Sequence, residues 1–197
     1  GTDYIGEAGW PSHGWPAGLF DICMVEKPRA AFHRAMWNDE PMVRIAVRDN
    51  ALDIDHGRDL WQWPNMAAIW NFPRAYEGLV IEVNTTTNCE RVALFHNGNE
   101  MGVRRTADYP NHTITWYLPY RRGTLVAKGI NGTDTVAVHE IRTAGDAVRL
   151  KATADRGKLM ADGQDLSYVQ VELLDKDGTL VQHADRYVKA SIEGEGR

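Results

Sequence analysis

From Pro41 onward, the sequence alternates apolar with polar residues at the period of two that β-strands show, and this pattern constrains the fold more than any other feature. A run of this kind predicts a strand with one buried and one solvated face. We therefore expect a mainly β chain built from antiparallel, immunoglobulin-like β-sandwich domains. Three runs show the pattern most clearly, with apolar residues at Val148, Leu150 and Ala152, at Val169, Val171 and Leu173, and at Val188, Ala190 and Ile192.

Turn residues separate these runs at the expected places. An Asn-Gly pair at 97–98 and another at 131–132 each lie between two strand-like segments. Such pairs supply the positive φ angles that a tight hairpin requires. Residues 175–178, Asp-Lys-Asp-Gly, predict a third turn before a short strand near Leu180.

The first forty residues follow a different pattern. A short strand-like run at 3–6 precedes a loop rich in Gly, Pro and Trp, and Pro28 then begins a breaker-free segment that predicts a helix over 28–37. A single strand and helix of this kind belong to a parallel sheet whose other strands are not in this chain. We therefore expect Ile5, Leu19 and Phe20 not to be fully buried within it.

The last fifty residues are short for the module that they resemble. They carry four strand signals over 146–197, whereas an immunoglobulin-like sandwich has about seven strands in about 100 residues. The expected organisation is a terminal strand–loop–helix unit over 1–39, one complete sandwich over 40–144, and a partial sandwich over 145–197. The tryptophans agree with a composite chain, because six of the seven lie in the first seventy residues.

Charge and motif content exclude several function classes. The formal net charge is −5, which disfavours a nucleic-acid partner. No apolar run approaches the roughly 18 residues of a membrane span, so we expect no membrane partner. The residue spacings include no zinc, P-loop or GxGxxG motif, and we expect no metal and no cofactor. A weak calcium-loop pattern over 53–64 has its glycine displaced and Pro64 at its twelfth position. Cys23 and Cys89 are expected to be free, although a disulfide between them stays open.

The order of several segments resembles glycoside hydrolase family 2, in particular its bacterial β-galactosidase-like branch. The resemblance to the end of the catalytic barrel is carried by DYIGE, a Trp-Pro-rich loop, GLFD and KPRAAFHRAMWNDEPMV. The resemblance to the sandwich that follows the barrel is carried by EVNTTTNCERVALFHNGNEMG and the stretch 116–129. The Thr-Ala-Gly at 143–145 resembles the boundary after that sandwich. RLKATADRGKLMADGQDLSYVQVELLDKDG resembles the opening of an Ig-like domain. The resemblance covers the whole chain.

The resemblance implies an activity for the family and a position for its catalytic residues. Members of the family are retaining exo-glycosidases in which two glutamates, about 5 Å apart, act as acid/base and nucleophile. Family patterns place both before the last strand of the (β/α)8 barrel, and nothing over 1–38 matches them. We therefore expect no catalytic residue in this chain and no activity from it alone. The implied partners are a galactoside-like carbohydrate and the rest of the barrel, and a homo-oligomer is possible. A bacterial periplasmic or secreted location is favoured over a cytoplasmic one.

The loop after the first strand holds the candidate substrate-binding residues, since barrel enzymes build their sites from such loops. Trp10 and Trp15 could stack on pyranose rings, and Glu7 and His13 could bond sugar hydroxyls. Both tryptophans could equally pack against the following domain. Glu7 is expected to orient neighbouring groups rather than to react.

Two alternatives of a different class remain open at this point. The aromatic residues Trp61, Trp63, Trp70 and Tyr76 could form a sugar-binding platform in a non-enzymatic carbohydrate-binding module. Their spacing also suits a linker that packs between barrel and sandwich, which is the interpretation that we favour. The chain could also act as a plain interdomain scaffold.

Overall fold

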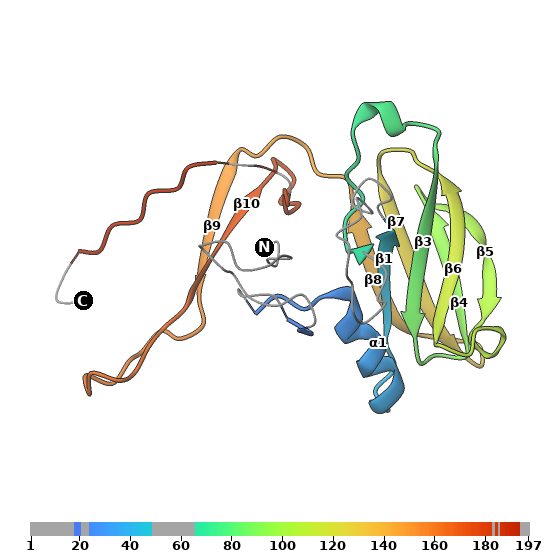
Figure 1. The fold of residues 1–197 in the computed structure, drawn as a ribbon, viewed down its shortest axis with the longest axis horizontal. Helices are drawn as coiled ribbons and strands as arrows, with labels where there is room; N and C mark the ends of the chain where they lie inside the picture. Colours follow the sequence, from blue (N-terminus) through green and yellow to red (C-terminus); the bar gives the residue numbers. More distant parts are fainter. Residues whose placement is uncertain (1–17, 21–23, 49–65, 183, 185, 194–197) are drawn as a thin grey trace, which may run out of the picture. The chain divides into compact units, whose positions relative to one another are not determined.

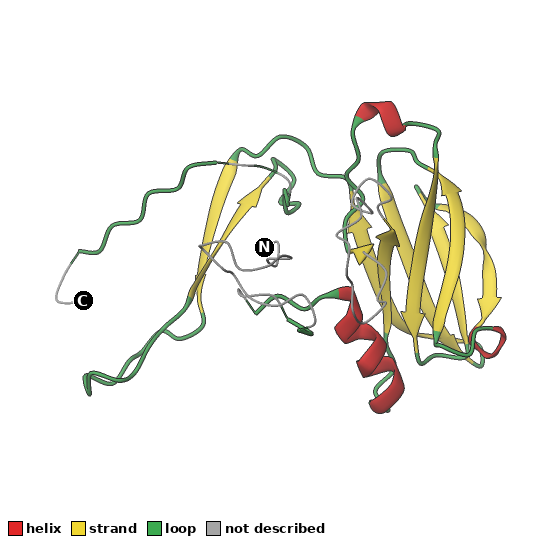
Figure 2. Cartoon of the chain, in the orientation of Figure 1, coloured by secondary structure: helices red, strands yellow, loops and turns green. Residues whose placement is uncertain are grey.

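The computed structural model describes residues 18–20, 24–48, 66–182, 184 and 186–193 (Figure 1). The described part is mainly β, as the alternating pattern predicts, and its strands pair antiparallel (Figure 2). The chain divides into two compact units, Gly1–Thr143 and Ala144–Arg197, and we describe each by itself.

Helix α1 spans Pro28–Trp37, the range that the sequence predicts. Proline suits the first helical position because its missing N–H would have no partner there. The helix ends where Asn38 turns to an extended conformation. Its alanines face inward, and Ala31 and Ala35 form a small buried cluster with Met42.

The first unit is a β-sandwich of two four-stranded antiparallel sheets. One sheet has the order β2-β1-β3-β6 and the other β5-β4-β7-β8. The strands are β1 (Val43–Arg48), β2 (Met66–Ala67), β3 (Val80–Thr87), β4 (Arg91–His96), β5 (Asn99–Arg105), β6 (Thr113–Pro119), β7 (Thr124–Asn131) and β8 (Asp134–Arg142). Short 3-10 helices cover Arg74–Tyr76 and Thr106–Asp108.

The core of the sandwich is formed by alternate residues of each strand, those whose side chains point inward between the two sheets. On β4, Val92 and Leu94 are fully buried, and on β7 so are Leu125 and Ala127. The facing sheet supplies residues such as Val83 on β3. This is the packing that a period of two predicts when two sheets meet face to face.

The hairpin turns follow the sequence prediction with one shift. Asn97 and Gly98 have φ angles of 51° and 80° and close the β4–β5 hairpin, as an Asn-Gly turn with two positive φ angles should. In the β7–β8 hairpin, by contrast, Asn131 still pairs with Asp134, so that the turn begins at Gly132. Gly132 has a φ of 57°, and glycine alone at the first central position is the type II′ pattern.

The second unit contains the described strands β9 (Arg149–Ala154) and β10 (Val169–Leu174), paired along their full length. The predicted turn at 175–178 is present. Asp175 accepts hydrogen bonds from the amides of Asp177 and Thr179 at 2.9 and 2.8 Å, and Leu174 pairs with Leu180.

Two expectations for this unit are wrong. Every residue of β9 is exposed, so this strand has no buried face, because within the described residues of the unit no second sheet covers it. The predicted strand at 188–192 does not form. The alternation is present there, but a strand also needs a hydrogen-bonded neighbour, and none pairs with it in the described part of the unit.

Candidate functional site

The four predicted substrate-binding residues, Glu7, Trp10, His13 and Trp15, lie outside the described residues, as do Trp61, Trp63 and the weak calcium-loop pattern over 53–64. Their placement stays a prediction. The structure does describe the segment that follows the loop. There, Leu19 is half-buried and Phe20 is 48% exposed. For these two side chains the expectation of incomplete burial is confirmed.

Trp70 is a core residue of the sandwich. It has no exposed surface, and its indole Nε1–H donates to the backbone oxygen of Arg121 at 3.0 Å. Phe72, His96 and Tyr120 meet its ring edge-on, with centroids 5.0–5.9 Å away. A ring with no exposed face cannot stack on a sugar, so Trp70 belongs neither to a sugar platform nor to an interdomain contact.

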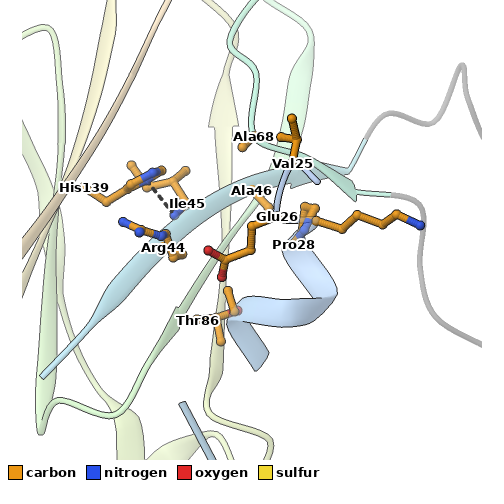
Figure 3. A pocket seen from close by; sticks show the side chains of 11 residues that line it. Val25, Glu26, Pro28, Arg44, Ile45, Ala46, Ala68, Thr86 and His139 are labelled. Carbon is orange, nitrogen blue, oxygen red and sulfur yellow. Dashed lines mark hydrogen bonds between the residues drawn. The ribbon is translucent and has the colours of Figure 1, made fainter. Parts of the chain in front are cut away.

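A cavity of about 270 Å³ lies between the segment that leads into α1 and the outer part of β1 (Figure 3). Glu26 and Pro28 border it on the helix side, while Arg44, Thr86 and His139 border it on the sandwich side. The remaining lining residues are Val25, Lys27, Ala31, Ile45, Ala46 and Ala68.

His139 on β8 joins the two sheets at this cavity. Strand β2 pairs only with Val47 and Arg48, so it does not reach the backbone of Ile45. The amide of Ile45 instead donates to Nδ1 of His139 at 3.1 Å. A ring nitrogen that accepts a hydrogen bond is unprotonated, which assigns the proton of the neutral ring to Nε2.

Burial and charge keep His139 neutral. Burial has the largest effect and, together with the nearby Arg44 guanidinium, lowers the pKa of His139 from 6.5 to about 4, while Glu26 opposes the shift. Nothing in the sequence marks His139 or Arg44 for this place, because the two residues lie on different sheets and their proximity follows from the topology.

The chemistry of the cavity does not suit glycoside hydrolysis. Retaining hydrolysis needs two carboxyl groups about 5–5.5 Å apart. Glu26 is the one acidic residue among the residues that line this cavity, and Arg34 contacts both of its oxygens at 3.2 and 3.3 Å. Within the described ranges, no group of three or more His, Cys, Asp or Glu residues could hold a metal ion. Among the residues that line it, the cavity therefore lacks the carboxyl pair that retaining hydrolysis uses.

Two further structural findings bear on the function classes. Cys89 is buried and free, and its Sγ–H donates to the oxygen of Met42 at 3.5 Å. Cys23 lies outside the described residues. Among the helices that the structure describes, none is long and apolar enough to cross a membrane.

Comparison with known proteins connects this fold to a family. Residues 150–197 match the family model described as glycoside hydrolase family 2 C-terminal domain 5, and residues 78–137 match a domain of unknown function (DUF4982). A solved structure of a glycoside hydrolase family 2 member from Bacteroides cellulosilyticus matches with a TM-score of 0.78 and 31% identity, over 92% of this chain and 23% of that one.

Two curated relatives align along almost the whole chain. A beta-galactosidase of Bacteroides ovatus is 30% identical over 199 residues, which cover all of this chain and 21% of that protein. A putative beta-glucuronidase of Formosa agariphila is 30% identical over 203 residues, covering 99% of this chain and 17% of that protein. The chain thus spans about a fifth of the length of these relatives. The family model, the relatives and the shared fold all connect the chain to glycoside hydrolase family 2, and the model over residues 150–197 matches one of the family's C-terminal domains.

Proposed function

We propose that the chain is part of a β-galactosidase-like enzyme that hydrolyses terminal β-glycosidic bonds with retention of configuration. The observation that carries the proposal is the alignment of all of this chain with the beta-galactosidase of Bacteroides ovatus. The match of residues 150–197 to a glycoside hydrolase family 2 C-terminal domain supports the family part of this proposal.

In this proposal the three segments of the chain have different roles. Residues 1–39 supply the last strand, loop and helix of the catalytic barrel. Residues 40–144 form a complete accessory sandwich, and residues 145–197 form part of an Ig-like sandwich. The position of α1 before the first sandwich strand is the order that this arrangement requires.

The loop before α1 would contribute to the sugar site. Trp10 and Trp15 offer flat apolar faces on which a pyranose ring could stack, and Glu7 and His13 offer hydrogen-bonding groups for its hydroxyls. The two catalytic glutamates would come from earlier barrel strands, so this chain would hold no catalytic carboxylate. This assignment rests on the family resemblance of the loop sequence.

The substrate class can be tested with a chimera. The 199 residues of the Bacteroides ovatus beta-galactosidase that align with this chain would be replaced by it. We expect the folded chimera to hydrolyse a chromogenic β-galactoside in preference to a β-glucuronide, and proton NMR to show the β-anomer as the first product. Preference for the glucuronide would contradict the galactoside assignment, and an α-anomer formed first would contradict retention.

Changes in the loop of the same chimera test the site residues. Trp10→Ala and Trp15→Ala should each raise the KM for the galactoside about fivefold, because one lost stacking contact costs on the order of 1 kcal/mol. The matched control is Tyr117→Ala, which removes an aromatic ring that is 65% exposed on β6 of the sandwich. Equal KM values for the loop variants and the control would remove both loop tryptophans from the site.

A further inference from the structure

The segment that connects α1 to the sandwich is held by one side chain from a distant turn. Asn88 lies in the turn between β3 and β4, 46–50 residues along the chain from the backbone groups that it contacts. Its Nδ2 donates to the backbone oxygens of Asn38 and Glu40 at 2.8 and 2.9 Å. Its Oδ1 accepts from the amide of Met42 at 2.7 Å. Both ends of the amide are therefore used on residues 38–42.

The turn that carries Asn88 does not need this side chain for its own structure. The amide of Cys89 is held by Oγ1 of Thr87 at 3.0 Å, and the amide of Glu90 by Oδ1 of Asn131 at 2.9 Å. Asparagines in turns commonly bond their own backbone two residues on, as Asn111 does with the amide of Thr113 at 3.2 Å. Asn88 departs from that pattern, because its three side-chain hydrogen bonds all reach residues 38–42.

Neighbouring contacts strengthen the same connection. Oγ1 of Thr87 donates to the oxygen of Met42 at 2.6 Å, and the Met42 side chain packs with Ala31 and Ala35 of α1. The first strand, β1, begins at Val43, directly after this anchor. The contacts of Asn88, Thr87 and Met42 therefore hold the end of α1 close to the start of β1.

The connection continues through α1 to the segment before it. Arg34 on α1 pairs with Glu26 at 3.2 Å, and the amide of Lys27 donates to the oxygen of Leu19 at 3.0 Å. Contacts thus run from the β3–β4 turn, through residues 38–42 and the helix, to Glu26, Lys27 and Leu19.

We propose that Asn88 is a latch that fixes α1, and through it the end of the preceding loop, on the sandwich. The latch itself depends only on the described contacts.

Hydrogen exchange of the full 197-residue chain tests the latch without any sugar. In Asn88→Ala, the amide of Met42 and the peptide 28–42 should exchange at least about tenfold faster than in the unchanged chain, since three hydrogen bonds of about 1 kcal/mol each are lost. In Asn88→Asp, which keeps the acceptor but not the donors, Met42 should stay protected while residues 38–40 exchange faster. The control Asn111→Ala should leave residues 28–42 within about twofold.

Each other outcome would overturn the latch. If Asn88→Ala and Asn111→Ala give equal exchange at 28–42, Asn88 does not hold the helix. If exchange rises mainly in the β3–β4 turn, the side chain serves only its own turn. If Asn88→Ala prevents folding, as judged by the fluorescence of the buried Trp70, its role is not confined to the connection. None of these results depends on glycosidase activity, so failure of the latch and failure of the proposed function are distinguishable.

Discussion

At the scale of single residues, one imidazole connects the two sheets at the part of the β1 edge that β2 leaves unpaired. His139 accepts the amide hydrogen of the buried Ile45 only while Nδ1 is unprotonated. Protonation would place a second hydrogen against that amide and a positive charge near Arg44, with Glu26 as the nearby opposing charge. Protonation of His139 at low pH should therefore destabilise the sandwich.

The sign of the pH dependence follows from the direction of the shift. The pKa of His139 falls from 6.5 to about 4 on folding, so the unfolded chain takes up the proton first. The contribution of neutral His139 to the free energy of unfolding should be fully present above about pH 6.5 and should decrease as the pH falls towards 4. We expect a loss on the order of 1–2 kcal/mol, below the full linkage value because the half-buried ring is partly screened by solvent.

Urea unfolding at pH 7, 5.5 and 4.5 can isolate this contribution. His139→Asn keeps an acceptor near Nδ1 and cannot titrate, so it should lose less stability on acidification than the unchanged chain does. Equal acid sensitivity of the His139 variant and the unchanged chain would contradict this role.

Trp70 gives a second prediction at this scale. Trp70→Ala should cost about 3–5 kcal/mol of unfolding free energy, because it removes a fully buried ring from between three other rings. Trp37→Ala, at a position that is 78% exposed, should change stability by less than about 0.5 kcal/mol in the isolated chain. Denaturant unfolding of the two variants checks both values, and similar costs would contradict the assignment of Trp70 to the core.

At the scale of elements, the sequence predicts what local chemistry determines. Pro28 and the breaker-free run after it define α1, and the Asn97-Gly98 pair defines one hairpin. The same rules place the second hairpin one residue too early, because Gly132 alone can supply the positive φ that its turn uses. They also predict a strand at 188–192 that has no partner in the described residues of its unit.

Features that depend on tertiary contacts could not be predicted in this way. In the sequence, nothing distinguishes Asn88 from an ordinary turn residue. Its contacts with residues 38–42 depend on the tertiary fold, which places that segment beside it. Trp70 shares its sequence region with Trp61 and Trp63, and only the packing assigns it to the core. The candidate site residues, Glu7, Trp10, His13 and Trp15, stay predictions because they lie outside the described residues.

The close packing of β7 against the β3–β4 turn gives a prediction for an element. A Cβ added at Gly129 would lie 2.6 Å from Sγ of Cys89 and 3.3 Å from Cβ of Ala137. Gly129→Ala should therefore cost about 1–3 kcal/mol through overpacking.

A double variant tests the cause of that cost. Combining Gly129→Ala with Cys89→Ala should destabilise by less than the sum of the two single changes, since the smaller side chain relieves the nearest contact. Gly157→Ala, where nothing lies within 4 Å of the added Cβ, is the matched control. Additive costs measured by urea unfolding would show that the contact with Cys89 is not the cause.

At the scale of the whole molecule, the chain spans about a fifth of the length of its curated relatives, and we propose that it acts as one part of a larger glycoside hydrolase. A separate carbohydrate-binding module would bind sugar by itself. The proposed role predicts that galactose causes no saturable quenching of tryptophan fluorescence in the isolated chain, because the barrel part of the sugar site is not in it. Saturable quenching that disappears in Trp10→Ala or Trp15→Ala would favour the binding module.

Hydrolysis of a chromogenic β-galactoside by the purified 197-residue chain tests the account most directly. The chain should first be shown to be folded by the fluorescence of buried Trp70. The account predicts no release of chromophore above buffer, since the proposed function assigns both catalytic glutamates to parts of the enzyme outside this chain. Turnover at roughly 1–10³ s⁻¹, the range of ordinary enzymes, would show that the chain carries its own catalytic carboxylates and would contradict the account.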